Sequence, residues 1–311
     1  MNKNTWFCFL LLILFLNHCS FYDNSKIWTG NENEIQRVAE LEAESKIETS
    51  KIYSTDDSFK EEIKVSKNFF LKDPANNEIW PMSGLNLQNS SGNLYLPTIT
   101  NRFLNKKVGK DRFDILQKIH SPIFYDNNIL ISDDSSFIRR INKNGSTYWK
   151  INVYEKIYKK LHKSITFSLV DNKIYVADNI GFIYVINYET GNVIWKKNYK
   201  IPFKSNIKIY KNKIFIINQD NTILCIDTKD GSIIWDVSTI DTFIKSQSLL
   251  GLAISKNGNL FALNTGGDVL KIEAFSGNVI WSMNSLTSLT EFGSDFFKSS
   301  DLVLNEKDLI F

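Results

Sequence analysis

The stretch "GNVIW" occurs twice in the chain, at Gly191–Trp195 and at Gly277–Trp281. Two variants of it, "GSTYW" at Gly145–Trp149 and "GSIIW" at Gly231–Trp235, complete a set of four. Their tryptophans are 46, 40 and 46 residues apart. A pattern that returns at this period indicates a repeat architecture, in which each unit buries its surface against the next one.

Each repeat contains four short runs rich in β-branched and aromatic residues, and turn residues separate the runs. The third turn holds the glycine of the pattern. Its pairs Asn144-Gly145 and Asp230-Gly231 predict two-residue hairpins in which both central residues have positive φ. Four strands per repeat at this period are the signature of a propeller blade. The sequence therefore predicts an all-β fold, a β-propeller of four-stranded antiparallel blades.

The glycine and the tryptophan of each repeat have a structural explanation. The glycine allows a tight turn between the third and fourth strands. We expect the tryptophan to open the fourth, outer strand and to lay its ring against the next blade, where a large ring contributes strongly to an interface. A row of tryptophans stacking on a ligand is the less favoured alternative, because equivalent positions in successive blades predict equivalent structural sockets. The residues concerned are Gly145, Trp149, Gly191, Trp195, Gly231, Trp235, Gly277 and Trp281.

The N-terminus reads as an export signal. Lys3 precedes the apolar run Trp6–Leu16, which is too short to cross a bilayer as a helix and matches a secretory signal peptide. Cys19 follows the run, with a leucine three places before it, and this arrangement resembles the lipobox of bacterial lipoproteins. The resemblance implies that Cys19 is lipidated, although His18 stands where these proteins have a small residue. Ser20 after the cysteine favours the outer membrane.

Three regions follow from these patterns. Residues 1–19 are predicted to be a lipoprotein-type signal peptide, and residues 20–79 a charged tether with a short helix in which Ile35, Val38 and Leu41 recur at a spacing of three. Residues 80–311 are predicted to be the propeller. Its last stretch, "SSDLVLNEKDLIF" at 299–311, matches the first two strands of a fifth blade. We therefore expect about four complete blades plus part of a fifth, an incomplete ring, and a chain that is a fragment.

Composition excludes several classes of function. The 37 basic and 34 acidic residues give a net charge of +3, which is too even for a nucleic-acid binder. His18, His120 and His162 are too dispersed to predict a metal site or an acid–base pair. Cys225, in the apolar run "TILCID", is predicted to be a buried, unreactive thiol. Asp133-Asp134 is best explained by turn formation. No cofactor is expected.

The motif "YVINYETGNVIW" at Tyr184–Trp195 resembles the repeat of pyrroloquinoline-quinone-type (PQQ-type) propellers. With the lipoprotein-type signal and "WPMSGLNLQNSSGNLYLP" at 80–97, the whole chain resembles the BamB family, the propeller lipoproteins of the outer-membrane β-barrel assembly machinery. The resemblance implies a non-catalytic scaffold, lipid-anchored on the periplasmic side of the outer membrane. Its implied partners are a POTRA domain of a BamA-like barrel-insertion subunit and unfolded outer-membrane proteins.

The resemblance also implies a contact site. In the family an interblade loop carries an apolar residue followed by a basic one, and the matching stretch here is "IPFKS", with Phe203 and Lys204. The next interblade loop contributes acidic residues in the family, but the corresponding "FIKSQSLLG" at 243–251 has none. The alternative for Phe203 and Lys204 is an ordinary loop with one docked ring and one solvated lysine.

Two other functions stay open. The same fold carries quinone-dependent dehydrogenases, which need a quinone, a calcium ion with oxygen ligands and a catalytic base. The chain has no adjacent cysteine pair of the kind found in the alcohol-dehydrogenase type, and the fold alone does not imply the cofactor. The second alternative is a generic exported propeller that binds another protein or a polysaccharide.

Overall fold

The computed structural model describes residues 36, 72–97, 104–105, 121–133, 135–239, 242, 245–246, 248–284 and 301–305. The chain divides into two compact units, residues 1–67 and 68–311. The predicted signal peptide with Cys19 and the tether lie outside the described residues, except that Gln36 is helical and exposed and that residues 72–79 belong to the second unit. Within that unit Ala75 pairs with Leu94.

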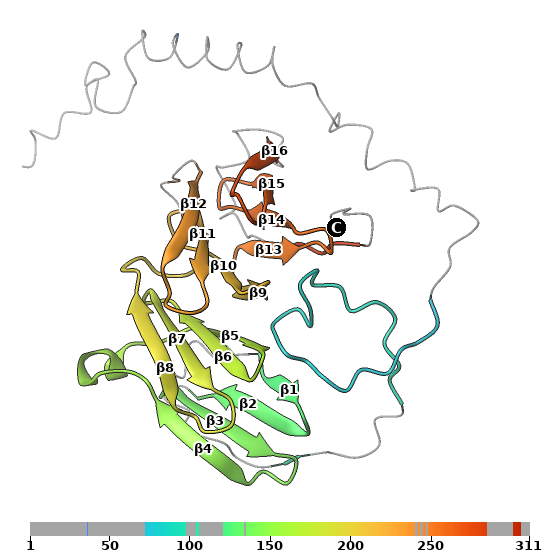
Figure 1. Cartoon of the computed structure of the whole chain (residues 1–311), viewed down its shortest axis with the longest axis vertical. Helices are drawn as coiled ribbons and strands as arrows, with labels where there is room; N and C mark the ends of the chain where they lie inside the picture. The colour runs from blue at the N-terminus through green and yellow to red at the C-terminus, as the bar shows by residue number, and fades with distance from the viewer. Residues whose placement is uncertain are drawn as a thin grey trace, which may run out of the picture. The chain divides into compact units, whose positions relative to one another are not determined.

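Four antiparallel sheets of four strands each follow one another along the chain, as the repeats predict (Figure 1). Strand order within each sheet is the order in the sequence, so every connection inside a sheet is a hairpin. We call the sheets blades 1 to 4. Their strands are β1 (Ile123–Tyr125), β2 (Asn128–Ser132), β3 (Phe137–Asn142) and β4 (Thr147–Asn152); β5 (Ile165–Val170), β6 (Lys173–Asp178), β7 (Phe182–Asn187) and β8 (Val193–Asn198); β9 (Lys208–Tyr210), β10 (Lys213–Ile217), β11 (Thr222–Asp227) and β12 (Ile233–Ser238); and β13 (Gly251–Ile254), β14 (Asn259–Leu263), β15 (Asp268–Glu273) and β16 (Val279–Asn284). A 3₁₀ helix, η1 (Lys156–Lys160), lies between blades 1 and 2.

Side-chain alternation decides which neighbouring blade a residue contacts. In blade 2, Tyr175 and Val185 join the apolar cluster shared with blade 3, whereas Val176 and Tyr184 join the cluster shared with blade 1. Successive residues of a strand point to opposite faces of its sheet, so a sheet between two others must be apolar on both faces. The central strands of blade 2 are therefore buried almost throughout. Apolar clusters join blade 1 to blade 2, blade 2 to blade 3 and blade 3 to blade 4.

The two edges of each blade differ in exposure. The fourth strands β4, β8, β12 and β16 are mostly exposed, whereas β13 is wholly buried and Ile123 and Lys208 at the starts of β1 and β9 are also buried. The first strands thus form the inner edges of the blades and the fourth strands the outer edges. This is the arrangement of a propeller, whose blades radiate from an axis.

The turn chemistry is partly as predicted. The first turns of blades 1 to 3 have two successive residues with positive φ, such as Asp171 at 50° and Asn172 at 60°, which is the type I′ geometry that matches strand twist. In the third turns only the glycine has positive φ, for example 76° at Gly145 and 71° at Gly231. The prediction of positive φ at Asn144 and Asp230 was wrong, because these third turns are longer than two residues and only their glycine is left-handed.

Each tryptophan follows a β-bulge in its outer strand. In blade 2, Val185 pairs with Trp195 and Ile186 with Val193, so Ile194 is the extra residue. The same shift occurs in the other three blades. The tryptophan is therefore the third residue of the fourth strand. The prediction that it would be the first residue of that strand was wrong. The bulge re-aims the outer strand at the position from which the indole meets the next blade.

Residues 301–305 lie against the outward face of blade 4. Leu302 and Leu304 are buried and share a cluster with Phe261, while Trp281 packs against that cluster. They cover the face that a fifth blade would cover. The rest of the predicted fifth blade lies outside the described residues.

Candidate functional site

The glycine–tryptophan pattern forms the junctions between blades. A Cβ built on Gly191 would lie 2.7 Å from the Trp149 ring, and one on Gly277 would lie 2.8 Å from the Trp235 ring. Gly231 stands in the same relation to Trp195, at 3.0 Å. The tryptophan of one blade thus rests on the glycine of the next, and any side chain there would collide with the indole.

A hydrogen bond accompanies each ring. The indole N–H groups of Trp149, Trp195 and Trp235 donate to the carbonyl oxygens of Tyr188, Thr228 and Ala274, at 2.8, 3.0 and 3.2 Å. Each acceptor is the residue that follows the third strand of the next blade. The tryptophans are partly buried in the interblade clusters, so the structural explanation of the repeat is confirmed for these three junctions.

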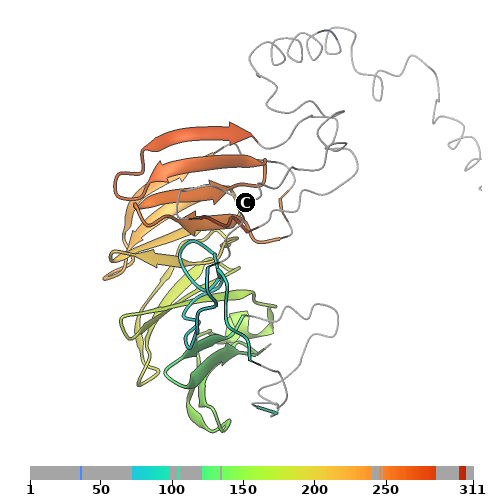
Figure 2. The same ribbon diagram turned by 90° about the vertical axis from the view of Figure 1, so that its right-hand side faces the viewer.

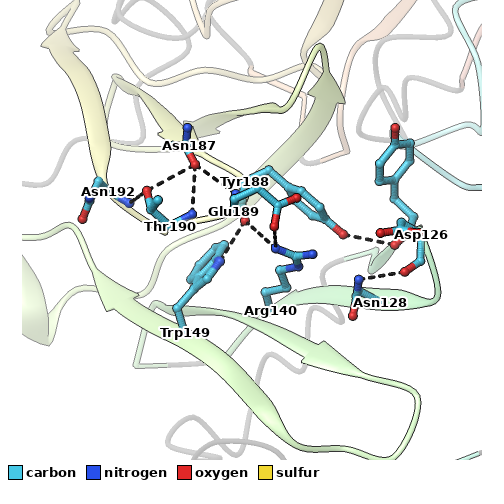
Figure 3. Close-up of polar contacts among 10 residues, drawn as sticks. Asp126, Asn128, Arg140, Trp149, Asn187, Tyr188, Glu189, Thr190 and Asn192 are labelled. Atoms are coloured by element: carbon cyan, nitrogen blue, oxygen red, sulfur yellow. Dashed lines mark hydrogen bonds and ion pairs between the residues drawn. The ribbon is translucent and has the colours of Figure 1, made fainter.

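The junction between blades 1 and 2 carries additional polar contacts (Figure 3). The Arg140 guanidinium lies 3.9 Å from the centre of the Tyr188 ring, donates to the Tyr188 carbonyl oxygen and pairs with Glu189. The Tyr188 hydroxyl donates to the carbonyl oxygen of Tyr125 at 3.1 Å. A buried arginine needs such partners for its charge. Because these polar groups contact one another, we infer that they stabilise the junction between blades 1 and 2.

The predicted contact residue Phe203 has a buried side chain, only 4% exposed, in the core between blades 2 and 3. Its ring meets Tyr199 edge-on at 5.6 Å, and its N–H donates to the Asp178 carbonyl oxygen. The docked ring matches the alternative explanation of the loop. As placed, the ring cannot reach a partner without moving, and its role in binding stays a prediction.

Lys204 lies in the same loop and is partly exposed. Its backbone joins two blades, because its N–H donates to Ile217 and its carbonyl oxygen accepts from Leu250, at 2.8 and 2.7 Å. The loop is thus held firmly between blades 2, 3 and 4, at the end of the blades that also carries the second turns. The side chain of Lys204 is partly exposed at this end.

Sequence reasoning missed an acidic residue on this end. Asp220, in the second turn of blade 3, forms an ion pair with Lys245 of the next interblade segment at 3.4 Å. The "FIKSQSLLG" stretch lacks acids of its own, but the neighbouring turn supplies one. The alternation of hairpins was a usable signal, because second turns and interblade loops must emerge at the same end of each blade.

The second turns themselves are closed by one Asp or Asn in each blade. The side-chain oxygen of Asp178 accepts from the N–H groups of Ile180, Gly181 and Phe182, each at 2.9 Å, and Tyr154 donates to the other oxygen at 2.7 Å. Burial raises the pKa of Asp178, and these hydrogen bonds oppose the rise. Asp133 accepts from Phe137 in the same way, so its turn role is confirmed. These acids close turns.

Other predicted residues have the following positions. Cys225 is fully buried and free, and burial raises the pKa of its thiol to about 12, as expected for an unreactive cysteine. Among the residues that the structure describes, no group of three or more His, Cys, Asp or Glu side chains could hold a metal ion. In the same part of the chain, no helix is both long and apolar enough to span a membrane.

The fold and its junctions define a class, the PQQ-like β-propeller repeat proteins. A family model described as outer membrane protein assembly factor BamB matches residues 134–296 of the 311-residue chain. The match covers more than half of the chain, and the chain therefore belongs to this family of propeller repeat proteins. No curated protein matches the sequence.

Several solved structures are similar to the chain. BamB from Moraxella catarrhalis has 14% identity and a TM-score of 0.46, with 56% of this chain and 51% of that chain covered. A quinohemoprotein alcohol dehydrogenase from Comamonas testosteroni has 12% identity and a TM-score of 0.52, covering 67% and 41%. A europium-containing methanol dehydrogenase has 10% identity and a TM-score of 0.50, covering 67% and 49%. The two dehydrogenases support the propeller fold alone, and the chain spans about half the length of the BamB structure.

Proposed function

We propose that the chain is a non-catalytic scaffold of the outer-membrane β-barrel assembly machinery. The observation that carries the proposal is the match of residues 134–296 to the family described as outer membrane protein assembly factor BamB. A series of blades joined by partly buried indoles suits a scaffold, because blades joined in this way keep their surfaces in fixed relative positions. Its partners are a POTRA domain of a BamA-like barrel-insertion subunit and unfolded outer-membrane proteins.

The lipid anchor belongs to the same proposal. Acylation of Cys19 attaches the chain to the periplasmic side of the outer membrane, with the tether between the anchor and the blades. The sequence pattern of residues 1–19 supports it, and mass spectrometry of protein from native membranes tests it. We expect the mature chain to begin at Cys19 and to carry acyl groups, and an unmodified Cys19 would contradict the anchor.

The proposed contact surface is the end of the blades that carries the loop of Phe203 and Lys204. Lys204 supplies an accessible charge on a backbone fixed to blades 3 and 4. Asp220 and Lys245 add charges of both signs from the next turn and interblade segment. A fixed pattern of charges gives an interface its specificity more than its total affinity.

A pull-down from native membranes tests the proposal. The wild-type chain is expected to recover the barrel-insertion subunit, and Lys204→Glu to reduce recovery at least about tenfold, as reversing a charge in an interface does. Phe203→Ala is avoided because it would open a cavity between blades. The matched control is Lys229→Glu, at an exposed position in a third turn at the opposite end of blade 3.

The outcomes separate the possible functions. If the wild type and Lys229→Glu recover the subunit and Lys204→Glu does not, the result supports both the scaffold role and the proposed contact surface. Recovery unchanged by Lys204→Glu contradicts the site. Absence of the subunit from wild-type eluates contradicts the role and favours a generic exported propeller that binds another protein or a polysaccharide. For the dehydrogenase alternative, titration with quinone and calcium is expected to leave the melting temperature unchanged, because ligands stabilise only a native state that binds them.

A further inference from the structure

The segment before the blades makes contacts that its sequence does not predict. Residues 80–89, here called the clasp, cross the inner edges of all four blades in succession. They belong to the segment drawn in cyan beside β1, β9 and β13 in Figure 1, which Figure 2 shows from the side. Inner edges carry unpaired N–H and C=O groups, which need partners when they are buried.

The clasp begins by extending the sheets of blades 1 and 2. Trp80 exchanges two backbone hydrogen bonds with Phe124 of β1, at 2.6 and 3.1 Å. The Pro81 carbonyl oxygen then accepts from Leu169 of β5 at 2.8 Å, and Met82 pairs with Ser168 in an antiparallel bridge. Met82 is buried. These contacts are those of an added strand in β-augmentation.

Blade 3 contacts the clasp through hydrogen bonds from one lysine side chain. Lys208 of β9 is fully buried, and its ammonium donates to the carbonyl oxygens of Ser83 and Asn86 and to the side-chain oxygen of Asn89, at 2.9, 2.8 and 2.6 Å. A buried ammonium has three protons to place, and the clasp supplies an acceptor for each. These three oxygens are therefore bound by the chain's own lysine.

The end of the clasp joins blade 4 to residues 301–305. The Leu87 carbonyl oxygen accepts from Ile254 of β13, and the Gln88 carbonyl oxygen accepts from Leu304, at 2.8 and 2.9 Å. The Asn89 amide donates to the carbonyl oxygens of Leu252 and Leu302, at 3.0 and 2.8 Å. Asn89 thus contacts blade 3 through Lys208, blade 4 through Leu252 and residues 301–305 through Leu302.

The backbone of the clasp adopts a left-handed conformation at two successive residues, and this conformation is strained at the second of them. Gly84 and Leu85 have φ of 76° and 72°, and a left-handed leucine is rare because its side chain crowds the backbone. Such a conformation persists only where the surroundings enforce it. A Cβ on Gly84 would lie 2.1 Å from the Asn89 side-chain oxygen, so only glycine leaves that oxygen room to reach Lys208.

We propose that the inner edges of blades 1 to 4 form a binding groove for an extended peptide, and that residues 80–89 occupy it as an internal ligand. The groove recognises main-chain groups along β1, β5 and β13 and a cluster of peptide oxygens at Lys208. The clasp keeps this groove closed to other ligands. The inference is independent of the proposed scaffold role.

A cross-link in the full chain tests the clasp directly. Met82→Cys with Ser168→Cys places two thiols at a bridged antiparallel pair, where the Cβ atoms are close enough for a disulfide. We expect mild oxidation to give an intramolecular 82–168 link, found by peptide mass spectrometry, at a rate independent of protein concentration. The control pairs Met82→Cys with Ser276→Cys, at an exposed third-turn position. Equal linking to both positions, or none to position 168, would overturn the proposal.

Hydrogen exchange gives a second readout. In Lys208→Met, the amides of Leu169, Ile254 and Leu304, which donate to the clasp, are expected to exchange at least about tenfold faster than in the wild type, while amides of β6 and β10 keep their protection. Unchanged exchange at the three amides would contradict the anchoring role of Lys208. An equal increase in the exchange rates of the β6 and β10 amides would show that the substitution destabilises the blades themselves, and would contradict a clasp that can leave the blades folded.

Discussion

Trp149, Trp195 and Trp235 show how one residue type closes a repeat structure. Each indole uses both of its properties: its face covers a glycine of the next blade, and its N–H satisfies a carbonyl oxygen there. The glycine has two reasons to be glycine, a positive φ and the closeness of the indole. The glycine and the tryptophan recur in the sequence because the same contact between an indole and a glycine is repeated at each of these junctions.

Lys208 is the residue whose charge state is expected to affect stability. Burial lowers its pKa from the usual 10.5 to about 7, while Asp301 opposes the shift. Between these values the unfolded chain binds more protons than the folded one, so the free energy of unfolding should rise as the pH increases from about 7 to 10. One titrating lysine gives a slope of at most about 1.4 kcal/mol per pH unit. The three oxygen acceptors favour the ammonium and reduce the slope below this limit.

Urea unfolding at pH 7, 8 and 9 checks this dependence. The wild type is expected to gain stability over this range relative to Lys208→Met, which has no titrating group. Lys143→Met, at an exposed third-turn position, is the control and should follow the wild type. Parallel pH profiles for the wild type and Lys208→Met would contradict a depressed pKa.

The elements were predictable to different degrees. The strands and first turns follow from apolar runs and from pairs such as Asp171-Asn172, because local sequence sets hairpin geometry. The sequence left two positions open for Phe203, a contact residue or a docked ring, since a loop residue becomes buried only through contacts with other blades. The clasp was unpredictable for a different reason: it binds mainly through backbone carbonyl groups, which every residue possesses.

A type I′ first turn can be improved in a predictable direction. Asn172 has φ of 60°, and replacing it with glycine removes the crowding of its Cβ at positive φ while keeping the Asp-Gly pair that such turns prefer. Asn172→Gly should raise the free energy of unfolding by roughly 0.5 kcal/mol, and Asn172→Val should lower it by about 1–2 kcal/mol. Thermal unfolding of both variants measures the difference. A stabilising valine would show that the turn is not of this type.

On the scale of the whole molecule, two sets of contacts hold the described blades. Indoles join neighbouring blades near their outer strands, and the clasp joins the first strands of all four blades at the inner edges. Repeat proteins usually contact only sequential neighbours, so the clasp adds contacts beyond those of an ordinary repeat array. Such contacts suit the proposed scaffold. The propeller repeat class was visible in the repeated glycine and tryptophan, whereas the resemblance to the BamB family also used the N-terminal signal and the stretch at 80–97.

A double-mutant cycle on the full chain tests the contact between Trp149 and Gly191. Trp149→Ala should lower the free energy of unfolding by roughly 2–4 kcal/mol. Gly191→Ala should lower it by at least about 1–2 kcal/mol in the wild type, but by less when the indole is absent, because its Cβ then has room. We expect a coupling of at least about 1 kcal/mol between the two substitutions. Additivity within about 0.5 kcal/mol would contradict the claim that the tryptophan of one blade rests on the glycine of the next.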